Sequence, residues 1–353
     1  MSRAATRLLP SGRLGVAGLV LGVGVLAAIP FVVAPYYVGL VTTAMIGAML
    51  ALSLQVLVGA TGLVSLGHGA FYGLAAYTVY LVSPEGHPQP IWLTLPLAML
   101  TAGIAALVVG ALSLRTKGFF FLMVTLAFGQ MIFFVFHDTK LGGGTDGAYL
   151  AKPTLSLLGA GFDAQSLPRS RRAWPAYYVA LVQLVATYLA LAFLVRSLFG
   201  RVLEGIRVNE HRMRALGYDT YRYKLAAFVV AGVLAGAAGH MWSLHSGFVN
   251  PELVSWHKSA EALLFILLGG IGSLAGPIVG AFAYTALVEV AQQVTERKLL
   301  LEGVVILAAV LVLRNGITGL RLGRAPQVSE MTDTMADPMA DREVARPGAA
   351  RDA

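Results

Sequence analysis

Apolar runs of about 20 residues recur along nearly the whole chain, and they restrict what this sequence can fold into. A helix needs roughly 20 apolar residues to cross the hydrocarbon core of a bilayer, where only helices and closed barrels satisfy their backbone hydrogen bonds. Such runs lie at 15–34, 37–58, 62–82, 91–113, 118–136, 176–195, 225–246, 255–273, 275–292 and 299–314. The sequence therefore predicts an all-α, polytopic membrane helix bundle of about ten transmembrane segments.

Charge is scarce, and its placement excludes some classes of protein. Only 12% of the residues are charged and 57% are hydrophobic, whereas soluble domains carry about a quarter charged residues. The net charge of +8 does not indicate nucleic-acid binding, because Lys and Arg lie between the apolar runs and form no single basic face. The absence of cysteine excludes disulfides and thiolate metal sites.

The basic residues also predict the topology. They gather at 115–117, at 196–224 and after residue 313, which the positive-inside bias assigns to the cytoplasm. The run 15–34 exceeds the roughly 7–15 apolar residues of a signal peptide and is interpreted as a retained first span. An even number of spans then places both termini inside. The pair within 255–292 is either one long bent helix or two short helices.

These assignments divide the chain into three parts. Residues 1–14 are predicted as a cytoplasmic N-terminus, 15–324 as the transmembrane domain and 325–353 as a disordered cytoplasmic tail of mixed charge. Within the domain, 196–224 is predicted as a cytoplasmic loop and 137–175 as an external loop. The external loop contains GGTDG, where Asp146 among glycines predicts a turn. Gly143, Thr145 and Asp146 are alternatively part of an external gate or docking surface.

The sequence lacks the motifs of several enzyme classes and contains a segment suited to coupling. It has no GxxxxGK[ST], HExxH or Gly-x-Ser-x-Gly motif, so we expect no catalytic residue, metal or cofactor in this chain. ATP can still act through a separate subunit that docks on an amphipathic helix. Residues 197–228 fit such a helix, with Gly217 as its stop. The apolar side predicted for it comprises Leu203, Ile206, Val208, Met213 and Leu216. The alternative is a basic loop without a docking role.

Five stretches together resemble one family. They are GLVSLGHGAFYGLAAYT (62–78), KGFFFLMVTLAFGQMIFF (117–134), GGTDG (143–147), FGRVLEGIRVNEHRMRALGYDTYRYKLAAFVVAGVLAGAAG (199–239) and NPELVSWHKSAEALLFILLGGIGSLAGPIVGA (250–281). The chain resembles the LivH/LivM family of branched-chain amino acid ABC transporter permeases, and it is more similar to LivM. The resemblance implies one subunit of an importer in a bacterial inner or plasma membrane. It also implies a second permease, two cytoplasmic ATPases and a periplasmic or extracellular solute-binding protein as partners.

The same resemblance implies roles for particular residues. The ATPase-coupling residues would be Arg201, Glu204, Arg207, Glu210, Ala215 and Gly217. The EAA consensus of importers is incomplete here, since His211 and Arg212 follow Glu210 and no Leu-Pro comes after them. Gln130 stands where LivM relatives often carry glutamate.

A translocation path is expected near the glycine-rich stretch. The path residues predicted are Ser65, Gly67, His68, Phe71, Thr125 and Gln130. Glycines in 62–73 permit close helix packing or a local break that lines a cavity. His68 is either a structural lock, a group beside the pore or a proton relay. Thr125 and Gln130 either bond to a neighbouring helix or contact the solute.

The solute is predicted to be small and neutral or zwitterionic, because no charged substrate site is recognisable. Three alternatives stay open. The first is a permease of the same family for urea, short amides or aromatic acids. The second is an autonomous secondary transporter or channel, which the scarcity of paired charges within spans disfavours. A membrane enzyme is the third.

Overall fold

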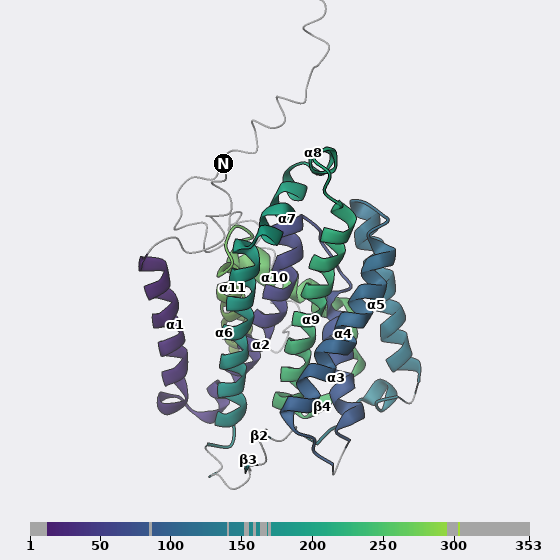
Figure 1. The fold of residues 1–353 in the computed structure, drawn as a ribbon. Coiled ribbons are helices and arrows are strands. Elements are labelled where there is room, and N and C mark those ends of the chain that lie inside the picture. Colours follow the sequence, from purple (N-terminus) through teal and green to yellow (C-terminus); the bar gives the residue numbers. More distant parts are fainter. Residues whose placement is uncertain are drawn as a thin grey trace, which may run out of the picture.

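Long helices form most of the structure, a computed structural model that describes residues 13–84, 87–139, 141–151, 155–157, 160–162, 168, 171–294 and 303. The α-helices are α1 (Arg13–Val32), α2 (Pro35–Gln55), α3 (His68–Val82), α4 (Ile91–Ser113), α5 (Phe119–Asp138), α6 (Trp174–Arg196), α7 (Leu198–Val208), α8 (Glu210–Ala215), α9 (Thr220–Ser246), α10 (Trp256–Gly269) and α11 (Gly276–Val294). Figure 1 shows a bundle with α7 and α8 at one end and the strands β2, β3 and β4 at the other. We call these the α8 end and the strand end.

Five described helices are long and apolar enough to cross a membrane. They are Pro35–Thr61, Ile91–Ser113, Phe119–Asp138, Trp174–Arg196 and Thr220–Ser246, and the shorter apolar helices are Val20–Val32 and Gly276–Ala291. The polytopic helical bundle predicted from the sequence is confirmed, whereas the count of ten spans is not. The predicted span 299–314 and the tail 325–353 lie outside the described residues, apart from Gly303.

Small residues hold the centre of the bundle together. Helix α9 packs on α3 and α4 through three glycines on one side. A Cβ at Gly236 would lie 2.6 Å from the Cβ of Ala102, and one at Gly239 would collide with the backbone of Tyr72. Such side-chain-free contacts bring helix backbones close, which is how apolar helices associate where the hydrophobic effect is weak.

The predicted span 62–82 is not one helix. Helix α2 continues into a wide π-helical turn, η1 (Val56–Thr61), and stops at Gly62, whose φ of +73° is left-handed. Residues 62–67 are not helical, and α3 begins only at His68. Glycines and a serine in this stretch permit the break, which hydropathy alone does not reveal because Leu63, Val64 and Leu66 keep the stretch apolar.

The doubtful pair within 255–292 consists of two helices. Helix α10 ends at Gly269, and α11 starts at Gly276. Gly270 has a φ of +106°, which favours glycine, and it ends α10. A Cβ at Gly280 would collide with the carbonyl of Phe265, so the two helices pack as a tight hairpin.

Short strands pair the loops at the strand end. Strand β1 (Ala148–Tyr149) pairs antiparallel with β4 (Phe248–Val249), joining Ala148 to Val249 and Tyr149 to Phe248. Strand β2 (Leu155–Leu157) pairs antiparallel with β3 (Ala160–Phe162). Two single turns of 3-10 helix, η2 (Gly144–Asp146) and η5 (Pro251–Val254), flank the first pair. The external loop predicted at 137–175 therefore contacts the residues that follow α9.

Candidate translocation and coupling sites

Five of the six predicted path residues lie together around the start of α3. Ser65 and Gly67 belong to the non-helical stretch, and Thr125 of α5 packs against it. The Leu66 amide donates to Thr125 Oγ1 at 3.4 Å, and a Cβ at Gly67 would collide with the Thr125 carbonyl. Gln130 lies further along α5 and is half-buried. Gly67 thus allows the stretch before α3 to pack closely against α5.

His68 binds to a neighbouring helix. Its Nε2 lies 2.9 Å from Ser53 Oγ on α2, and its ring packs edge-on against Phe71. Because the Ser53 hydroxyl donates to the Leu50 carbonyl at 2.6 Å, its oxygen is left to accept from His68 Nε2–H. The ring is fully buried, and its Nδ1 has no partner among the described residues. This geometry favours the structural lock over a proton relay, which needs a partner on each nitrogen.

These path residues are covered by their own chain. Ser65, His68 and Thr125 are buried, as are Gly67 and Phe71. In this arrangement they pack helices against one another and line no open passage.

A charged pair that sequence analysis did not anticipate stands on the first two turns of α10. Lys258 Nζ lies 2.7 Å from Glu261 Oε2, and the two side chains are 29% and 30% exposed. The spacing of three residues within a predicted span was a usable signal, since residues i and i+3 share a helix face.

The predicted gate residues lie at the strand end. Thr145 and Asp146 form the turn η2 and are exposed, and Gly143 before them has a left-handed φ of +85°. Gly147 follows and packs so closely on the Val249 carbonyl that a Cβ would collide with it. The turn is thus fixed beside β4 at the surface.

The segment predicted for coupling forms two helices and not one, because a cap interrupts it. Asn209 Oδ1 accepts from the Arg212 amide at 2.9 Å and starts α8, just as Ser197 starts α7 and Asp219 starts α9. Gly217, with a φ of +87°, lies just beyond α8. The predicted stop at Gly217 agrees with this structure.

The five apolar residues predicted to share one side do not do so in the structure. Leu203 and Ile206 are buried against the bundle, whereas Val208 and Leu216 are 80% and 65% exposed. The expectation that all five apolar residues share one side was therefore wrong. The exposed members belong to a groove of about 540 Å³ between α7 and α8. Its lining is Arg201, Glu204, Gly205, Val208, Asn209, Arg212, Met213 and Leu216.

The other predicted coupling residues face different neighbours. Arg207 donates from its guanidinium to the Gly59 carbonyl in η1, and Ala215 is exposed on α8. Gln55, at the end of α2, donates to the Ile271 carbonyl at 2.7 Å in the turn between α10 and α11. The structure thus joins α7 to η1, and α2 to the α10–α11 hairpin.

Glu210 ties α8 to the start of α9. Lys224 Nζ lies 2.6 Å from one of its carboxylate oxygens, and Thr220 and Arg214 bond to the other. Partial burial raises the pKa of the Glu210 carboxyl, but the bonds and charges of Lys224, Thr220 and Arg214 outweigh it and lower the pKa to about 2. The carboxylate is therefore charged at neutral pH.

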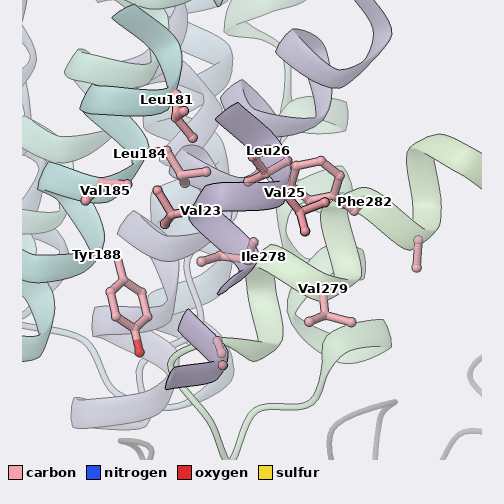
Figure 2. Close-up of a pocket in the computed structure, with 14 residues that line it drawn as sticks. Val23, Val25, Leu26, Leu181, Leu184, Val185, Tyr188, Ile278, Val279 and Phe282 are labelled. Carbon is pink, nitrogen blue, oxygen red and sulfur yellow. The ribbon is translucent and has the colours of Figure 1, made fainter. Parts of the chain in front are cut away.

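A separate groove lies between α1, α6 and α11 (Figure 2). It has a volume of about 900 Å³, and Tyr188 is the one polar side chain of its lining. Leu26, Leu184 and Phe282 are among its apolar lining residues. Such a wall suits hydrocarbon and offers nothing to a zwitterion. The described residues also include no group of three His, Asp or Glu side chains placed to hold a metal ion.

Comparison with known proteins supplies the remaining information. The family described as "Branched-chain amino acid transport system / permease component" matches residues 36–313. The high-affinity branched-chain amino acid permease proteins LivM of Salmonella typhimurium and Escherichia coli are each 34% identical over 289 residues, covering 78% of this chain and 68% of each relative. LivH of Salmonella typhimurium is 23% identical over 290 residues, 77% of this chain and 91% of LivH. No solved structure matches the chain.

Proposed function

Because the chain belongs to the branched-chain amino acid permease family and is the permease subunit of an ABC importer, we propose that it moves branched-chain or related amino acids inward by alternating access. The observation that carries the proposal is the extent of the match, since residues 36–313 include α2 to α11. The helices form a multi-pass membrane protein. We place it in a bacterial inner membrane, with the α8 end and both termini in the cytoplasm.

Two ATPases are proposed to act at the α8 end, one of them on the groove between α7 and α8. Val208 and Leu216 expose apolar surface in a segment that otherwise carries many charges. Exposed apolar groups rimmed by polar ones are typical of protein contact sites. Arg201 and Glu204 at the groove would orient the ATPase, and Arg207 would pass its movement to η1.

The second permease is proposed to pack along α5. This helix is the least buried of the five long apolar helices described, and it exposes Phe120, Met131 and Phe134. It also carries Thr125 and Gln130, so a partner there would place these residues beside a path between the two subunits. The solute-binding protein is proposed to dock at the strand end, where Thr145 and Asp146 are exposed.

Reconstitution of the complete importer tests the proposal. The chain, its partner permease and the two ATPases would be placed in proteoliposomes with the binding protein outside. We expect uptake of labelled leucine, isoleucine or valine that requires ATP in the compartment of the ATPases. Uptake of urea without any of these amino acids would overturn the substrate assignment. Transport by this chain alone, driven by an ion gradient, would overturn the coupling assignment.

A further inference from the structure

The pair Lys258–Glu261 lies deep within the bundle. The Gly69 amide donates to Ser259 Oγ at 2.7 Å, and a Cβ at Gly69 would lie 3.0 Å from Lys258 Cβ. The strand end of α3 is Val82, 13 residues from Gly69, or about 20 Å at 1.5 Å per residue. With Val82 taken as the edge of a hydrocarbon core about 30 Å thick, a position about 20 Å further in lies inside that core. Charged side chains at this depth are rare and mark solute paths.

The chain reaches this depth through its loops. After α9 the residues of β4 and η5 run inward from the strand end, and Gly73 of α3 lies directly against the backbone of Leu253 and Val254. Helix α10 therefore begins inside the bundle, close to the start of α3. Helices that begin at mid-depth direct their positive N-terminal ends at the solute in other transporters.

Two helices, α9 and α3, lie beside the pair. Lys258 Nζ lies 5.8 Å from the centre of the Trp242 ring on α9, within the range of a cation–π contact. The start of α3 packs on the same turn of α10, where the Gly69 amide donates to Ser259 Oγ. The site thus combines a cation, an anion and an aromatic face, and both charged side chains remain partly exposed.

We propose that this pair is the point at which the permease binds a zwitterionic α-amino acid during passage. The solute carboxylate would bind Lys258, and its ammonium would bind Glu261 and the face of Trp242. Without solute the two side chains neutralise each other, so neither charge is left unpaired in the bundle. Two weak contacts of this kind hold a solute and still release it. The inference rests on the proposed function, and it excludes urea, which has neither charge.

The test uses the complete importer in proteoliposomes. Lys258→Met and Glu261→Gln are each expected to lower leucine uptake about tenfold, since a hydrogen bond to a charged group contributes on this order. ATP hydrolysis stimulated by the loaded binding protein should persist. Glu252→Gln, which removes an exposed carboxylate from η5, is the matched control and should transport normally.

The double variant Lys258→Met/Glu261→Gln separates binding from structure. It leaves no unpaired charge, so a purely structural pair would regain stability and uptake, and that result would overturn the proposal. We expect uptake to stay low while the apparent melting temperature recovers. If the wild type carries leucine and both single variants match it, the pair proposal fails and the proposed function stands. If the wild type carries only urea, both fail.

Discussion

Arg207 of α7 hydrogen-bonds to the carbonyl oxygen of Gly59 in η1, and this bond joins the proposed ATPase-docking segment to the end of α2. Gly59 lies within the last four residues of η1, where backbone carbonyls have no hydrogen-bond donor within the helix. From η1 the connection continues through Gln55 to Ile271 and the α10–α11 hairpin. Movement at α7 thus has a bonded route into the bundle.

Arg207→Ala is expected to uncouple ATP hydrolysis from transport. Loss of a charged donor should lower the amount of leucine moved per ATP about tenfold. The measurement compares uptake and phosphate release in the same proteoliposomes. Arg222→Ala is the matched control, because that side chain is 84% exposed and pairs with nearby Asp219. An unchanged ratio in a well-folded Arg207→Ala importer would contradict this route.

Gly67→Ala should destabilise the chain by about 1–3 kcal/mol, the usual cost of overpacking. The added methyl collides with the backbone of Thr125, which cannot rotate away as a side chain would. A lower apparent melting temperature in detergent would report the effect. Gly24→Ala provides the control, since nothing lies within 4 Å of that position. Equal melting temperatures for the two variants would show that α3 and α5 are not packed as described.

The Glu210 network predicts a dependence of stability on pH. Its pKa is about 2 in the folded chain and 4.5 when unperturbed, so the folded state binds fewer protons. The network therefore makes its full contribution to the free energy of unfolding above about pH 4.5, and this contribution is lost as the pH falls toward 2. The melting temperatures of wild type and Glu210→Gln should differ by a constant amount above about pH 4.5 and converge as the pH falls from about 4.5 to 2. A difference between the two melting temperatures that stays constant from pH 4.5 to 2 would contradict the lowered pKa of Glu210.

His68 variants distinguish the lock from the relay. His68→Ala should cost roughly 1–3 kcal/mol, because the bond to buried Ser53 is lost. His68→Gln retains a donor and should transport almost as well as the wild type, since glutamine can bond but cannot shuttle a proton. Uptake assays and melting curves on both variants decide the matter. A stable His68→Gln importer without uptake would support the relay.

Hydropathy alone was sufficient to predict the helical bundle, because the thickness of a bilayer sets the length of every membrane-spanning helix. It failed where the chain bends within the membrane. Residues 62–67 are apolar enough to count as span, yet they are not helical. Within the coupling segment, the cap by Asn209 was readable from its residue type. Ile206 and Val208 are two residues apart on α7, so the helical repeat alone turns them about 200° from each other, with Ile206 buried and Val208 exposed.

The charged pair was missed for a different reason. In the sequence Glu261 lies near the end of an apolar segment, where a charge reaches water at modest cost. Its depth depends on η5 carrying the chain inward before α10 begins, and that is a tertiary property.

Helix α9 runs unbroken for 27 residues, about 40 Å, from the Glu210 network to the strand β4. A single helix therefore connects the Glu210 network at the α8 end, where the ATPase is proposed to dock, with the β1–β4 pair at the strand end. Thermodynamic linkage then requires reciprocity: if binding-protein occupancy alters nucleotide affinity, bound nucleotide must alter binding-protein affinity by the same factor. Titrating the binding protein onto importers in the presence and in the absence of ATP would measure that factor as a change in binding-protein affinity.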